Sequence, residues 1–188
     1  MLLKIVQVGE PVLREHAREI TPDEIRGREI QELIAWMRET MYEAPGVGLA
    51  APQIAKAIQL AVIEDKAEYM EKALPELLKE RERHPVPFQV IINPKITLHE
   101  GDRAIFHEGC LSLAGFTAAV PRARRVTVEC LDHNAKARTI QANGWYARIL
   151  QHEIDHLYGT LYVDRMDTKT FATVENFTHH SGGVFGKK

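Results

Sequence analysis

The chain has 188 residues, a length typical of one domain, and 45% of them are hydrophobic and 27% charged. This composition excludes collagen-like, coiled-coil and intrinsically disordered proteins. A net charge of −2 gives no basic field for a phosphate backbone, so we expect no direct nucleic-acid binding. Two cysteines are too few for a disulfide-stapled secreted domain, and no apolar run is long enough for a membrane span, which indicates a soluble intracellular protein.

The first quarter of the chain predicts two helices. Pro11 begins a short one over residues 11–17. Thr21-Pro22-Asp23-Glu24 provides the N-cap residue, first-turn proline and glutamate of a capping box, and apolar residues recur after it at helical spacing. We therefore expect one continuous helix until Ala44-Pro45-Gly46, because Pro45 disfavours helical backbone at the residue before it.

Two strands and a surface excursion are expected next. Short apolar runs indicate buried strands over 58–63 and 90–94. Residues 64–84 between them are rich in Glu, Lys and Arg, which is typical of a solvent-exposed segment, with a short helix at 74–78.

The last part of the chain predicts a hairpin and a long helix. Residues 125–130 alternate in polarity and indicate a half-buried strand, and 136–141 can return as its partner. A helix then runs from the N-cap Asn143 to Gly159. Strands on both sides of one helix indicate an α+β fold, with short, mostly antiparallel strands packed around that helix in a single domain over residues 1–188.

Residues 151–156 read Gln-His-Glu-Ile-Asp-His and contain the pattern H-E-x-x-H. His152 and His156 lie one turn apart on the same helix face, so both imidazoles can reach one metal ion. Glu153 is displaced by about 100° around the axis and can approach a bound water without binding the metal. The alternative is a surface helix with two solvated histidines. The apolar residues around the motif disfavour it, because a buried glutamate needs a compensating cation.

Two further segments add to this motif. Cys110, within Glu108-Gly109-Cys110-Leu111-Ser112, offers a thiolate. Together with two imidazoles it leaves one tetrahedral position open for water, as in catalytic metal sites. The segment Gly46-Val47-Gly48-Leu49-Ala50-Ala51-Pro52-Gln53 has small residues that let a peptide backbone approach, and Gln53 offers an amide donor. It lacks the glycine pattern of dinucleotide-binding loops and the lysine of phosphate-binding loops.

Together the three segments resemble the motifs G-x-G-x-A-A-x-Q, E-G-C-x-S and Q-H-E-x-D-H of the peptide deformylase family, in the same order and spacing. The resemblance covers nearly the whole chain and is greatest to the branch found in eukaryotic organelles and some bacteria. It implies a hydrolase of protein biosynthesis that removes the formyl group from the N-formyl-methionine of nascent polypeptides and releases formate.

The resemblance also implies the roles of individual residues. It implies one divalent metal held by Cys110, His152 and His156. Fe²⁺ is expected physiologically, although Zn²⁺, Ni²⁺ and Co²⁺ suit the same ligands. The resemblance implies that Glu153 acts as general base and then as general acid. It also implies that the Gln53 amide and the Leu111 backbone N–H donate hydrogen bonds to the oxyanion.

We expect the substrate peptide to bind as an added strand beside Val47 and Gly48. Trp145 and Ile149 share a helix face with His152 and are expected to wall an apolar pocket for the methionine side chain, with Phe106 opposite. Ordinary core packing is the alternative for Trp145 and Ile149. We expect Glu108 to support the strand that carries Cys110 by binding a partner residue. For Asp155 two alternatives stay open: it supports the site, or it lies on the helix surface.

The partners implied are formyl-Met nascent peptides. Whether the protein works close to the ribosome, and whether it is a monomer or a dimer, are left open by the sequence. The tail after Asp167 does not resemble the basic C-terminal helix of many bacterial members. The expected location is the cytoplasm for a bacterial chain, and the mitochondrial or plastid interior for a processed organellar one.

Two rival interpretations differ in their metal ligands. A zinc endopeptidase would take its third ligand from downstream, where the chain offers Asp164, Asp167, Glu175 and His179. A zinc-stabilised binding module would need a fourth protein ligand, such as His107, His133, His179 or His180.

Overall fold

The computed structural model describes residues 1–44, 46–71, 73–99 and 101–180. Its strands are β1 (Gly48–Ala50), β2 (Leu60–Asp65), β3 (Val86–Leu98), β4 (Arg103–Glu108), β5 (Phe116–Ala123), β6 (Arg125–Leu131), β7 (Ala137–Asn143) and β8 (Ala172–Thr173). Its α-helices are α1 (Pro22–Arg26), α2 (Arg28–Glu43), α3 (Pro75–Glu80), α4 (Gly144–Leu157) and α5 (Val174–His180). Short 3₁₀ turns lie at Pro11–Arg14, Ala51–Ile54, Ala67–Tyr69, Tyr162–Asp164 and Thr168–Thr170.

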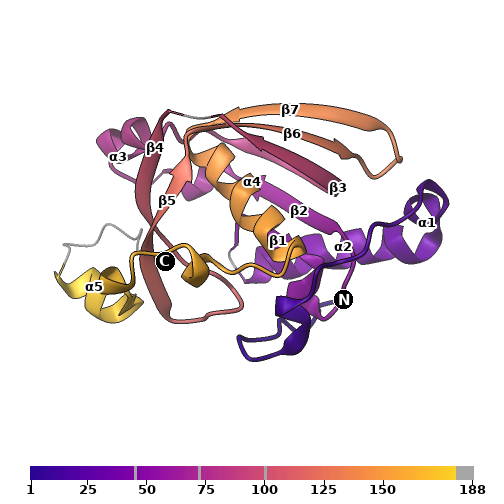
Figure 1. Ribbon diagram of the computed structural model, residues 1–188, viewed down its shortest axis with the longest axis horizontal. Coiled ribbons are helices and arrows are strands. Elements are labelled where there is room, and N and C mark those ends of the chain that lie inside the picture. Colours follow the sequence, from indigo (N-terminus) through magenta and orange to yellow (C-terminus); the bar gives the residue numbers. More distant parts are fainter. Residues whose placement is uncertain (45, 72, 100, 181–188) are drawn as a thin grey trace.

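The strands form two sheets, both antiparallel. One has the order β1-β2-β3-β6-β7 and the other β4-β5-β8. Helix α4 contacts strands of both sheets and runs through the centre of the molecule (Figure 1). The predicted α+β fold with a central helix is therefore confirmed. No helix in the described part of the chain combines the length and apolarity needed to cross a membrane.

The larger sheet has a helix on each face because its strands alternate. In β2, Ala61 and Ile63 pack in the cluster that contains the apolar residues of α4. Leu60 and Val62 point the other way, into the cluster formed with α2. Each face buries a full row of apolar side chains, and this burial is the main term that stabilises a two-sided sheet. Helix α4 is thus held with its histidines at a fixed position relative to β1.

The predicted N-terminal helices need correction. The capping box is present, since Thr21 accepts from the Glu24 backbone N–H and Glu24 accepts from that of Thr21. The single helix expected after it is divided into α1 and α2 at Gly27, which has extended backbone with ψ 149°. The segment expected over 11–17 is only a 3₁₀ turn. Helix α2 ends at Glu43 with Ala44 as its C-cap residue, so the helix end expected at Ala44 is confirmed, while Pro45 itself lies outside the described residues.

The predicted hairpin is confirmed as β6 and β7. The strand expected at 90–94 is longer, because β3 continues through a bulge at Asn93, where φ is +48°. The pairing of β4 with β5 was not predicted, since neither segment shows a clear alternation of polarity.

The charged segment 64–84 is only partly a solvent-exposed excursion. Helix α3 occupies its predicted place, but Asp65 is fully buried and forms two hydrogen bonds of 2.8 Å with Arg83. The Arg81 carbonyl accepts a hydrogen bond from the Trp145 backbone N–H at 2.8 Å. This contact replaces the cap predicted from Asn143, whose side chain makes no capping hydrogen bond. The segment therefore fixes the N-terminus of α4.

Candidate metal centre

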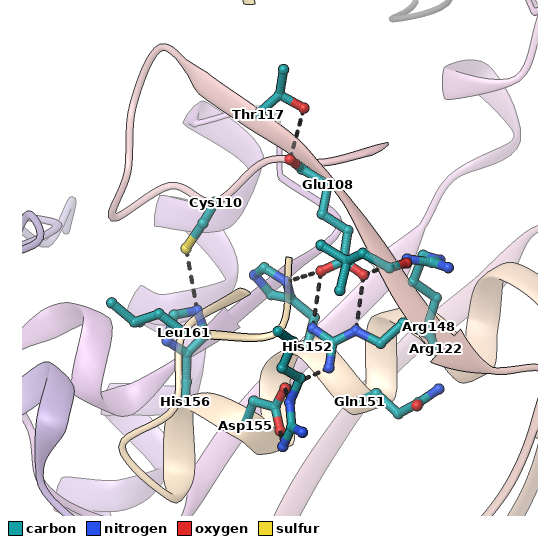
Figure 2. Close-up of polar contacts among 12 residues, drawn as sticks. Glu108, Cys110, Thr117, Arg122, Arg148, Gln151, His152, Asp155, His156 and Leu161 are labelled. Carbon is teal, nitrogen blue, oxygen red and sulfur yellow. Dashed lines mark hydrogen bonds and ion pairs between the residues drawn. The ribbon is translucent and has the colours of Figure 1, made fainter. Parts of the chain in front are cut away.

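Two elements bring a sulfur and two imidazoles together. His152 and His156 project from α4, and Cys110 lies in the turn that follows β4 (Figure 2). The Cys110 Sγ is 3.2 Å from His156 Nε2, and one ligand atom of each residue lies within 4.8 Å of the others. In the described residues this is the only such group of three or more potential ligands. Among the described residues, neither a downstream third ligand, as in an endopeptidase, nor a fourth ligand, as in a structural site, belongs to this group.

The donor atoms fit a divalent metal such as Zn²⁺ or Fe²⁺, which accept thiolate and imidazole. His156 is 1% exposed. Burial, followed by the charge of His152, lowers the pKa of His156 well below its usual value, so that its imidazole is neutral. Cys110 Sγ also lies 3.4 Å from the Ser112 backbone N–H and 3.5 Å from Gln53 Nε2. Two N–H donors therefore face the sulfur.

Glu108 orients His152 from behind. Its Oε2 lies 3.0 Å from His152 Nδ1, which leaves Nε2 of that ring for the metal (Figure 2). Arg122 binds both carboxylate oxygens, at 2.9 and 3.0 Å, and Arg148 binds Oε1 at 2.6 Å. Burial alone would raise the pKa of Glu108, but the hydrogen bonds from His152 and Arg122 hold it well below its usual range. Glu108 therefore stays ionised and supports the cysteine strand, as expected.

Asp155 extends this network and does not reach the metal ligands. It binds Arg122 at 2.5 Å and Arg165 at 2.7 and 2.8 Å. Of the two alternatives for Asp155, the structure favours support of the site, because Asp155 binds Arg122, and Arg122 binds Glu108.

Glu153 is buried like Glu108 but lacks its partners. It is 4% exposed, its Oε2 has no hydrogen-bond partner in the structure, and burial raises its pKa to about 7. Its carboxylate lies directly against Gly48 of β1, where a side-chain Cβ would overlap the carboxylate. A glycine at position 48 is therefore required for this placement of Glu153.

Gln53 directs its amide N–H₂ toward the sulfur. Its Oε1 accepts from the Ala50 backbone N–H at 2.8 Å, which fixes the amide orientation. Its Nε2 then lies 3.3 Å from the Ser112 hydroxyl as well as near Cys110. Leu111 lies between Cys110 and Ser112 in the chain, and its carbonyl accepts a hydrogen bond of 2.9 Å from the Gln7 side-chain amide.

The residues expected to contact substrate lie on α4, on β4 and at β1. The rings of Phe106 and Trp145 are 6.3 Å apart at 62°, and Trp145 is half-buried. Ile149 is 4% exposed and packs in the core cluster, and its expected place in the pocket wall stays a prediction. Gly48 lies in an edge strand, whereas the Val47 carbonyl already accepts from the Glu64 backbone N–H at 3.0 Å.

Sequence reasoning missed Arg122 and Arg148. Arg148 is four residues before His152 on the buried face of α4, so a charged residue at an otherwise apolar helix position was the available signal. Arg122 lies in β5, which was not predicted. Gln151, within the helix motif, ties α4 to β5 through two hydrogen bonds to the Ala123 backbone, at 2.9 and 3.1 Å.

Comparisons with known proteins agree with this geometry. The family model described as polypeptide deformylase matches residues 2–172. The chain is 50% identical over 172 residues to the chloroplastic peptide deformylase 1A of Solanum lycopersicum, covering 92% of this chain and 62% of that protein. It is 38% identical over 170 residues to the mitochondrial peptide deformylase of Homo sapiens, covering 90% and 70%.

A solved structure gives the same result. The Met-Ala-Ser-bound class I type b peptide deformylase from Acinetobacter baumannii has a TM-score of 0.77 and 29% identity, covering 88% of this chain and 99% of that one. The chain spans less than two thirds of the Solanum lycopersicum protein.

Proposed function

Because the chain belongs to the polypeptide deformylase family, we propose that it removes the formyl group from N-formyl-methionine at the start of nascent polypeptides. Its organelle-targeted plant and human relatives confirm the resemblance to the organellar branch. The observation that carries the proposal is the Cys110, His152 and His156 cluster beside an unpaired, buried Glu153.

Cys110, His152 and His156 are the residues that would hold the metal. A divalent ion held there would supply Lewis acidity and would lower the pKa of a water molecule to about 7. Fe²⁺ is the physiological ion that we propose, with Zn²⁺, Ni²⁺ and Co²⁺ as substitutes that the same ligands accept.

Glu153 moves the proton. Its Oε2 has no competing hydrogen bond, and a pKa raised to about 7 lets the carboxylate accept a proton and release it again near neutral pH. Water attacks the formyl carbon, the bond from that carbon to the methionine nitrogen breaks, and formate leaves. Glu153 accepts the proton of the water and gives it to the departing amine.

Gln53 and Leu111 stabilise the charge that develops on the formyl oxygen. The Gln53 amide is held by Ala50 before any substrate binds, so no reorganisation is needed during the reaction. The Leu111 backbone N–H lies in the turn that also holds Cys110. Loss of one such donor typically costs about 10²–10³-fold in rate.

The substrate peptide binds along the free edge of β1, beside Val47 and Gly48. The methionine side chain lies in the apolar pocket formed by Phe106, Trp145 and Ile149. The partners are formyl-Met nascent peptides, met near the ribosome. The location is a mitochondrion or plastid for an organellar chain and the cytoplasm for a bacterial one.

The proposal is tested by formate release from formyl-Met-Ala-Ser. We expect one formate per peptide from iron-loaded protein prepared without oxygen. Cys110→Ala should lose both bound metal and activity. Cys130→Ala is the matched control, because Cys130 is a buried core cysteine outside the cluster, and it should keep its metal. Retention of metal and turnover by Cys110→Ala would contradict the proposal.

A further inference from the structure

Arg81 differs from the other arginines near the candidate metal centre. Arg83 and Arg148 each bind a carboxylate, whereas Arg81 makes no ion pair within the described residues. Its Nε is buried and has no hydrogen-bond partner among the residues that the structure describes. Burial and the charge of Arg83 lower the pKa of Arg81, which is the expected behaviour of a cation without a compensating anion.

The guanidinium of Arg81 lies at the edge of the proposed methionine pocket. Its central carbon is 4.7 Å from the centre of the Trp145 ring and 5.5 Å from that of Phe106. The Arg81 backbone is fixed by the hydrogen bond from the Trp145 N–H to its carbonyl. The indole Nε1 of Trp145 is also buried without a partner. One edge of the pocket thus presents a cation and an unused N–H donor together.

Neighbouring acidic residues do not supply the missing anion. Glu82 binds Arg124 at 3.0 Å and the Asn143 side chain at 2.7 Å. Glu80 is exposed, and although its charge acts on Arg81, the two form no ion pair. A half-buried cation of this kind is best satisfied by a ligand that brings its own carboxylate.

The geometry of an extended peptide decides which substrate residue can supply it. Alternate side chains of a strand lie on the same side, and residues two apart are separated by about 6.6 Å. If the methionine side chain lies against the wall that Trp145 and Phe106 form, the third residue would project toward the same side of the peptide, which is the side that we assign to Arg81. The second residue projects away from it.

We propose that Arg81 is a specificity-determining residue that binds an acidic side chain at the third position of the substrate peptide. This inference rests on the proposed function. A partly screened ion pair should favour the acidic peptide by about 3–10-fold in kcat/KM.

The test uses formyl-Met-Ala-X-Ser peptides with amidated C-termini, where X is Glu, Gln or Lys, so that no terminal carboxylate competes. We expect kcat/KM to fall from Glu to Gln to Lys, and the differences to shrink at high salt. In the isomer formyl-Met-X-Ala-Ser, the same change of X should have little effect.

Variants then assign the preference to one side chain. Arg81→Gln should bring the Glu-to-Gln ratio to about one, and Arg81→Glu should reverse it in favour of Lys. Arg125→Gln is the matched control, since Arg125 is exposed on β6, and its ratio should equal that of the wild type. Circular dichroism checks that each variant is folded.

Equal rates for Glu and Gln peptides in the wild type, or an unchanged ratio in Arg81→Gln, would overturn the role of Arg81. Absence of formate from every peptide would contradict the proposed function and this inference with it.

Discussion

Glu108 and Glu153 are both buried carboxylates beside His152, but their surroundings differ. Glu108 meets Arg122, Arg148 and the His152 ring, and these partners hold its pKa well below the usual range against the effect of burial. Glu153 has an oxygen with no hydrogen-bond partner in the described part of the chain, and burial raises its pKa to about 7.

The comparison shows that burial alone does not decide what a carboxylate does. Partners keep Glu108 ionised, so it can orient a metal ligand but cannot exchange a proton near neutral pH. The lack of partners leaves Glu153 able to hold or release a proton in that range. One carboxylate positions the site, and the other is suited to act in it.

The largest expected effect is that of Glu153→Gln. The amide keeps the size of the side chain but cannot accept the proton, so kcat for formyl-Met-Ala-Ser should fall by about 10²–10⁴-fold. The metal content, measured by elemental analysis, should stay at the wild-type value. A metal-loaded variant with wild-type turnover would show that Glu153 does not transfer the proton.

Glu108→Gln should act on stability and metal binding. It leaves Arg148 buried without a carboxylate, so the free energy of unfolding should fall by about 3–5 kcal/mol in urea titrations. Loss of the contact to His152 should weaken metal affinity by about 10–100-fold in a chelator competition.

Asp155→Asn is the matched control for Glu108→Gln. Its partner Arg165 is exposed, and Arg122 would still form its ion pair with Glu108. The free energy of unfolding should therefore fall by less, about 1–3 kcal/mol. Equal losses in the two variants would contradict a central role for Glu108.

The pH dependence of stability should separate the two carboxylates in metal-free protein. Between about pH 4.5 and pH 7, the folded chain keeps a proton on Glu153 that the unfolded chain has released. The free energy of unfolding should therefore fall as the pH rises through this window and level off above it, by at most about 3 kcal/mol. Glu153→Gln should lack this contribution. Identical pH profiles for the two proteins in urea unfolding would exclude the raised pKa.

Gly48→Ala tests the placement of Glu153 without changing its chemistry. The new Cβ would overlap the carboxylate and displace it, and a shift of about 1 Å can cost about 10²-fold in rate. Gly109→Ala is the control, because a Cβ there meets only the Phe116 carbonyl at an ordinary 3.7 Å.

The double variant shows whether Gly48 acts through Glu153. Gly48→Ala combined with Glu153→Gln should be no slower than Glu153→Gln alone, because both changes remove the same function. Additive losses would show that Gly48 acts by another route.

Much of the ligand set could be predicted because it depends on local spacing. The i, i+4 histidines and the strong helix pattern of α4 are properties of one segment, and the β6–β7 hairpin follows from local alternation and turn residues. The break at Gly27 was missed because apolar residues continue at helical spacing on both sides of it.

The support around the site could not be predicted because its partners are far apart in sequence. Glu108, Arg122 and Arg148 come from β4, β5 and α4, and only the fold brings them together. The burial of Asp65 in the charged segment 64–84 could not be predicted for the same reason. Arg83 has no local sign of pairing, yet it closes the segment onto the buried Asp65.

X-ray absorption spectroscopy of the iron- or zinc-loaded protein tests most directly whether Cys110, His152 and His156 bind the metal. We expect one metal per chain, bonded to one sulfur and two imidazole nitrogens, and loss of the sulfur signal in Cys110→Ala but not in Cys130→Ala. A metal bound only through nitrogen and oxygen in the wild type would contradict the assignment of Cys110, His152 and His156 as the ligands.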